Sequence, residues 1–153
     1  MTTSHASDER RAIDVAERRR PPRADHRSDA RERALYRLYE AESKGVAPRV
    51  VLAEQVLAPD ELTTLLVAGV EDHREEIDQL IAEHAHDWTL ERMPAIDRNV
   101  LRLATFELAH RLDVPVGVVI DEAVELVKRF STDDSGRFVN GVLSALAAKL
   151  RAA

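Results

Sequence analysis

The chain has 153 residues, of which 44% are hydrophobic and 33% charged, with no cysteine and a formal net charge of −6. This length favours one domain with its own core, and the lack of cysteine excludes disulfides, thiol catalysis and cysteine-ligated metal sites. The net acidity argues against a protein that coats nucleic acid indiscriminately, and no apolar run approaches the roughly 18 residues of a membrane span. With scarce glycine and proline and no strand-like alternation, the sequence predicts a cytoplasmic, all-α protein of about seven helices.

Residues 1–27 contain almost no apolar side chain beyond Ile13 and Val15, so we expect a flexible basic tail ahead of a domain spanning 28–153. Up to residue 33 there are nine arginines and seven acidic residues, a local charge of +2, which leaves −8 on the remainder. The densest positive charge is the RRRPPR run at 18–23. This run either keeps the protein soluble or binds phosphate, and composition alone favours neither reading.

The first predicted helix begins at Ser28 or Asp29 and ends at Gly45, a residue type that often terminates helices. Asp29 and Glu32 have the spacing of a capping box. Arginines crowd the opening turns, where positive charge is unfavourable with the helix dipole. We therefore expect an external anion to account for these arginines, which are Arg27, Arg31 and Arg33.

The middle of the chain predicts a short helix from Pro48 to about Leu57 and then a helix that starts at Pro59 and whose apolar pattern continues over residues 62–84 with a bend. Histidines lie along and just beyond this pattern. Because they show no recognisable metal-ligand spacing, we expect solvated or packed histidines and no metal site. These histidines are His73, His84 and His86.

The C-terminal half predicts a short helix capped by Thr89 and interrupted by Pro94, then helices over about 96–108, 115–130 and 135–150. The third of these four carries a row of carboxylates without a basic or nucleophilic companion. A solvated face explains them better than catalysis does. They are Asp121, Glu122 and Glu125.

Two features of the last helix carry more information. Its start has three N-cap candidates, Asp133, Asp134 and Ser135. Its interior contains Asn140-Gly141, although glycine inside a helix costs about 1 kcal/mol relative to alanine. Either close helix packing or a bound surface would explain the glycine, and spacing alone favours packing.

Motifs of catalysis are missing: the sequence has no glycine-rich phosphate loop, catalytic triad spacing or HExxH motif. We therefore predict no catalytic residue, no cofactor and no enzymatic activity.

Four segments resemble the transcription antitermination factor NusB family, in order and at matching separations: Ala30–Gly45, Ala95–Leu108, Asp113–Ser131 and Asp133–Leu143. The FVNGVL ending behind a short acidic turn is the most specific part. The resemblance implies a NusB-like fold of two packed helical bundles. It also implies binding of single-stranded boxA RNA in rRNA leader transcripts together with the ribosomal protein NusE, in a complex that helps RNA polymerase resist premature termination.

The resemblance also implies site residues. An aromatic ring would stack on an unpaired base, arginines would contact phosphates, and Asp134 would accept from base amino groups or cap its helix. The implied RNA-binding residues are Arg27, Arg31, Lys128, Asp134, Arg137 and Phe138. The implied partner-binding residues, suited to NusE, are Tyr39 and Asp97.

Two other readings remain open from the sequence. A NusB-like domain also accompanies rRNA cytosine methyltransferases as an accessory RNA-binding module, although this chain leaves no room for a cofactor-binding domain. A purely structural helical module that forms a homodimer is the other alternative.

Overall fold

The computed structural model describes residues 9–11, 13, 26–86 and 88–152, and these residues form helices and connecting turns without any strand. The all-α prediction is confirmed. None of the described helices combines the length and the apolar character needed to cross a membrane. In chain order the elements are α2 (His26–Lys44), α3 (Pro48–Ala53), α4 (Glu61–Asp72), α5 (Arg74–His84), the 3-10 helix η1 (Leu90–Arg92), α6 (Ala95–His110), α7 (Val116–Phe130) and α8 (Asp133–Leu150).

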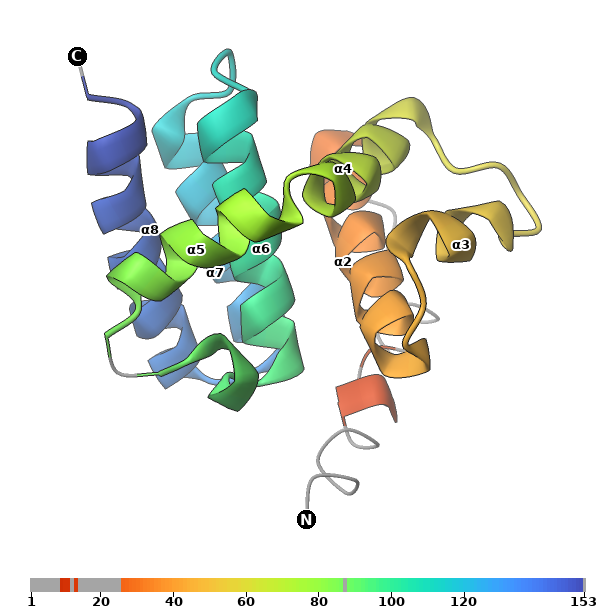
Figure 1. Ribbon diagram of the computed structural model, residues 1–153, viewed down its shortest axis with the longest axis horizontal. Coiled ribbons are helices and arrows are strands. Elements are labelled where there is room, and N and C mark those ends of the chain that lie inside the picture. Colours follow the sequence, from red (N-terminus) through yellow and green to blue (C-terminus); the bar gives the residue numbers. More distant parts are fainter. Residues whose placement is uncertain (1–8, 12, 14–25, 87, 153) are drawn as a thin grey trace.

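The helices form two packed groups, as expected from the family resemblance (Figure 1). Helices α2, α3 and α4 make one group and α5 to α8 the other, and α6 contacts α2 and α4 as well as its own neighbours. Apolar side chains from both groups meet in one core, which explains why the groups are held together. Fully buried members of this core include Leu35, Leu66, Ile77, Ile96, Leu101, Leu108, Leu143 and Leu146.

Part of the expected N-terminal tail belongs to this core. Residues 9–11 are helical, and Ile13 is 4% exposed among the core side chains. The expectation of a tail without packing is therefore corrected at Ile13. The other residues of that segment before His26, including the arginine run at 18–23, lie outside the described residues.

Three helix boundaries differ from the sequence expectation. Helix α4 begins after Asp60, whose carboxylate accepts from the Thr63 amide at 3.2 Å, and not at Pro59. The bend expected within residues 62–84 is a full break at His73 (φ −111°, ψ 21°), after which α5 packs across α6 and α8. The cap of α8 is Thr132, whose hydroxyl accepts from the Ser135 amide at 3.1 Å, so none of the three predicted cap residues performs this role.

Close helix packing at a glycine occurs at Gly69 in α4 and not at Gly141. A Cβ atom on Gly69 would lie 2.2 Å from Cζ of Phe106, whereas a Cβ on Gly141 would meet nothing within 4 Å. The packing explanation for Gly141 is therefore wrong, and an exposed surface remains.

The end of α6 is closed by a residue that follows α8. The Arg151 guanidinium donates hydrogen bonds of 2.8–3.2 Å to four carbonyl oxygens at and beyond this helix end. Backbone donors are scarce at the C-terminal end of a helix, so the Arg151 guanidinium adds donors there. Glu107 also accepts from the Arg111 amide, and Arg111 from the Val114 amide. The accepting residues are Glu107, Leu108, Arg111 and Val114.

Candidate nucleic-acid interface

A shallow groove of about 450 Å³ lies between α7 and the first half of α8, and we call it the α7–α8 groove. It brings together two predicted RNA-binding residues, Lys128 from the last turn of α7 and Arg137 from α8. A polar amide and two carboxylates complete its polar lining. The full lining is Asp121, Val124, Glu125, Lys128, Gly136, Arg137 and Asn140.

Gly136 gives Lys128 its place in this groove. A Cβ atom on Gly136 would approach Cγ and Cε of Lys128 to 3.2 Å, closer than most real contacts. The aliphatic stem of Lys128 therefore lies along bare backbone of α8, and its charged end remains at the exposed surface.

Asp134 and Arg137 form a hydrogen-bonded ion pair across one turn at the start of α8. Their side chains are 87% and 74% exposed. An exposed pair of this kind contributes at most about 1 kcal/mol, so an incoming anion can compete for the guanidinium. Asp134 does not cap the helix, because Thr132 does.

Phe138 is partly buried and packs against the core from α8. Trp88, which precedes η1, lies beside it with ring centroids 5.2 Å apart and planes at 65°, and Trp88 is 40% exposed. We call these two rings the aromatic pair. Nothing local in the sequence links Trp88 to a ring 50 positions later, so the sequence alone does not indicate this pair.

Two predicted arginines at the start of α2 differ in exposure. Arg27 is exposed, and its neighbour Ser28 hydrogen-bonds Glu122 of α7. Arg31 is 2% exposed, and its guanidinium donates to both carboxylate oxygens of Glu107 at 2.7 and 3.0 Å. The assignment of Arg31 to RNA binding is therefore corrected, because this side chain is enclosed against α6.

Arg33, the third arginine of these turns, also has an internal acceptor, Asp60 at 3.3 Å. For Arg31 and Arg33 the expected external anion is replaced by carboxylates of the protein itself.

The predicted partner-binding residues are both buried. Tyr39 is 5% exposed and Asp97 is fully enclosed in the first turn of α6. Burial raises the pKa of Asp97; the nearby Ser135 and Ser131 hydroxyls oppose this shift, without forming hydrogen bonds of standard geometry to the carboxylate. Asp97 thus lies beneath the turn between α7 and α8, so its assignment to a partner-facing surface is corrected, as is that of Tyr39.

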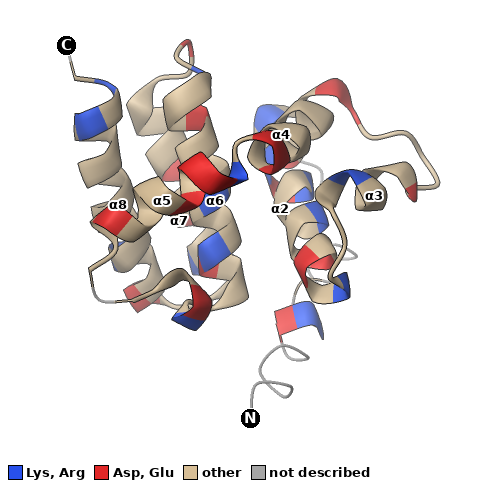
Figure 2. Ribbon diagram, in the orientation of Figure 1, with Lys and Arg blue, Asp and Glu red and all other residues tan. Residues whose placement is uncertain are grey.

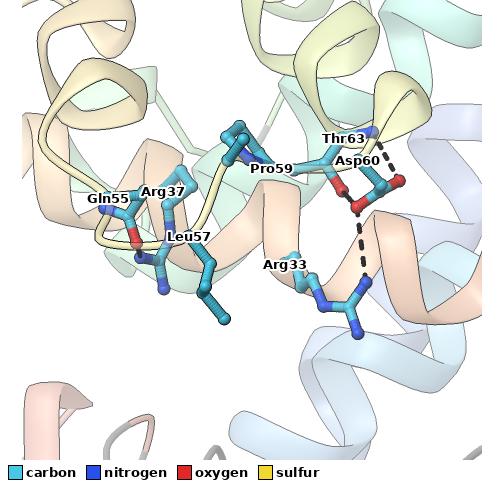
Figure 3. Close-up of a pocket in the computed structure, with 8 residues that line it drawn as sticks. Arg33, Arg37, Gln55, Leu57, Pro59, Asp60 and Thr63 are labelled. Carbon is cyan, nitrogen blue, oxygen red and sulfur yellow. Dashed lines mark hydrogen bonds and ion pairs between the residues drawn. The ribbon is translucent and has the colours of Figure 1, made fainter.

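A second hollow, of about 380 Å³, lies between α2 and the loop before α4 (Figure 3). Its two arginines are held by neighbours: Arg33 by Asp60, and Arg37 by the Gln55 side chain. Leu57 borders the hollow and is 84% exposed. Both guanidinium groups of this hollow therefore have acceptors within the protein.

Charges of both signs are interspersed over the helices, as seen along α2 in Figure 2. Electrostatic attraction of RNA would therefore depend on a few placed cations, and not on a uniformly basic surface.

Comparison with known proteins gives consistent results. The transcription antitermination protein NusB of Saccharopolyspora erythraea is 54% identical over 127 residues, covering 79% of this chain and 86% of that protein. The structure of T. maritima NusB superposes with a TM-score of 0.73 at 34% identity, covering 82% of this chain and 92% of that one. A crystal structure of the antitermination factors NusB and NusE in complex with dsRNA superposes with a TM-score of 0.68 at 33% identity, covering 80% of this chain and 96% of that one.

The NusB family model matches residues 28–148, which include every helix from α3 to α7 and most of α2 and α8. The resemblance seen in the four sequence segments is confirmed, and the chain belongs to the NusB family.

Proposed function

We propose that this protein is a non-enzymatic adaptor in transcription antitermination. It binds single-stranded boxA RNA of rRNA leader transcripts together with NusE, and it helps RNA polymerase resist premature termination. The observation that carries the proposal is that α8 contributes both Phe138, one ring of the aromatic pair, and Arg137, which lines the α7–α8 groove together with Lys128. Support also comes from the similar crystal structure of NusB and NusE in complex with dsRNA.

On the proposed RNA-binding surface, the aromatic pair and the groove have different roles in binding a flexible strand. An unpaired base stacks on an exposed ring for about 1–3 kcal/mol, which suits Trp88 and Phe138. Lys128 and Arg137 contact phosphates, and the Asn140 amide can donate to or accept from a base edge. The exposed Gly141 leaves space for the strand to approach the helix backbone.

The carboxylates of the groove set a limit on this affinity. Asp121 and Glu125 line the same hollow as the two cations, so phosphate attraction is partly cancelled. We therefore expect weak binding of boxA RNA alone and stronger binding with NusE, which adds its own contacts.

The test is a fluorescence anisotropy titration of labelled boxA RNA, with and without NusE. We expect Trp88→Ala and Arg137→Gln each to weaken binding at least about fivefold, the loss expected for one stacking or charge-assisted contact. Arg49→Gln is the matched control, because Arg49 is an exposed arginine of α3 held by Glu71 and Asp72. If Trp88→Ala and Arg137→Gln bind as tightly as Arg49→Gln and the parent protein, the proposed face is wrong.

The arginine run at 18–23 is tested separately by salt. Replacing its four arginines with serine should make the plot of log affinity against log salt concentration shallower, by about 0.7 for each phosphate that these arginines neutralise in the parent protein. An unchanged slope would show that these arginines neutralise no phosphate of the bound RNA.

A further inference from the structure

Three side chains with metal-binding atoms meet where the junction of α4 and α5 lies against the end of α6. They are His73 at the junction, Glu76 in the first turn of α5, and His110 as the last residue of α6. Nε2 of His110 lies 3.0 Å from Oε1 of Glu76, and Nδ1 of His73 lies 4.0 Å from Oε2. One potential ligand atom from each residue falls within 4.8 Å of the others.

The two imidazoles are held together by the packing beneath them. Their centroids are 3.8 Å apart with planes at 24°, and the Phe106 ring stacks on His73 at 6.0 Å and on His110 at 5.6 Å. Phe106 occupies this position because Gly69 has no side chain in its way. The cluster is therefore placed by the helix packing and is not a chance meeting of long, mobile side chains.

We propose that His73, Glu76 and His110 bind one divalent transition-metal ion of the zinc class. Two imidazoles and one carboxylate suit Zn²⁺, Co²⁺ or Ni²⁺, whereas Ca²⁺ and Mg²⁺ prefer oxygen ligands alone. Three protein ligands also leave a coordination position for water.

Small side-chain movements complete the site. Metal–ligand bonds of about 2.1 Å at tetrahedral angles put ligand atoms roughly 3.4 Å apart, so a separation of 4.8 Å would have to close by about 1.4 Å. Side chains 30–49% exposed have room for this. Because an imidazole lone pair lies in the ring plane, at least one ring must rotate out of the stack to face the ion.

The site lies at the far end of α6 from the aromatic pair. Helix α6 has 16 residues and is therefore about 24 Å long, with His110 at its C-terminal end and Trp88 near its N-terminal end. A bound ion would fasten the α4–α5 junction to α6 and stabilise the folded state, while RNA binding would remain unchanged.

The test is calorimetric titration of the full-length, untagged protein with ZnCl₂. We expect one ion per chain, and at least about tenfold weaker binding in His110→Asn and His73→Asn. His86→Asn is the matched control, because His86 is an exposed histidine outside the cluster. Circular dichroism of each variant without metal establishes that the helices are intact.

Thermal unfolding gives a second readout. Zn²⁺ should raise the Tm of the parent protein and of His86→Asn, but not that of His110→Asn. No heat of binding in the parent protein, or equal binding by His110→Asn and the parent, would overturn the proposal. Weakening by His86→Asn as large as that by His110→Asn would do the same, since it would place the ion elsewhere.

Discussion

Replacing Gly69 with alanine should destabilise the protein, although alanine is the better helix former. The new Cβ would lie 2.2, 2.4 and 2.7 Å from three atoms of the Phe106 ring, where carbon atoms normally keep about 3.5–4.0 Å. Phe106 is 4% exposed and stacks on His73 and His110, so it cannot move without disturbing them. Overpacking of this kind costs about 1–3 kcal/mol, and the helix-propensity gain returns about 1 kcal/mol. Because an approach of 2.2 Å is severe, we expect a cost near the upper end of this range and a net loss of up to about 2 kcal/mol.

The matched control is Gly141→Ala, also within a helix, where the added methyl group would meet nothing within 4 Å. This variant should be more stable than the parent by about 0.5–1 kcal/mol. Urea denaturation followed by circular dichroism measures both free energies of unfolding. If Gly69→Ala gains stability as Gly141→Ala does, the close packing at Phe106 is not real. Adding Phe106→Leu to Gly69→Ala should recover part of the loss, because leucine is smaller than the ring.

The other predictions concern buried and paired charges, and each is measured as the free energy of unfolding. Glu107→Gln should cost about 3–5 kcal/mol, because it leaves the Arg31 guanidinium buried without its carboxylate; a loss below about 1 kcal/mol would contradict this. Burial alone would raise the pKa of Glu42, but hydrogen bonds and charges from Arg98, Asn99 and Arg102 together outweigh it, so the pKa is lowered. The stabilisation that ionised Glu42 gives the folded state is therefore present above pH 4.5 and is lost as the pH falls through the pKa of the folded protein. The difference in free energy of unfolding between the parent and Glu42→Gln should therefore become smaller in acid. A difference that does not change with pH would refute the lowered pKa of Glu42. Burial raises the pKa of Asp97, so the parent should lose stability as the pH rises from 3.8 through the raised value, and Asp97→Asn should remove that loss.

Local features of the sequence predicted much of the fold. Gly45 ends α2 as expected, with φ at +67°, a conformation that favours glycine. Apolar spacing located the core faces of α6 to α8. The family resemblance implies the grouping of Lys128 and Arg137. These residues lie only nine positions apart in the sequence, on either side of the turn between α7 and α8.

What the sequence could not predict depends on contacts between distant segments. The acceptor of Arg31 is Glu107, 76 positions later, so nothing near Arg31 indicates that this arginine is enclosed. The role proposed for Trp88 depends on its contact with Phe138, and the role proposed for His73 depends on its contact with His110 of another helix. Asp97 has the charge of a surface residue, and its burial becomes apparent only once the α7–α8 turn is seen above it.

The hydrogen bonds of Arg151 have a consequence for synthesis. The four carbonyls to which this guanidinium donates lie 37–44 positions upstream, so α6 and the corner after it are synthesised well before Arg151 is added. During that interval water takes the place of the Arg151 donors, although Glu107 and Arg111 already accept from backbone amides, and the corner is freer to fray. A nascent chain therefore acquires its finished α6 end only when translation has passed residue 151, which makes this corner one of the last parts of the molecule to become rigid.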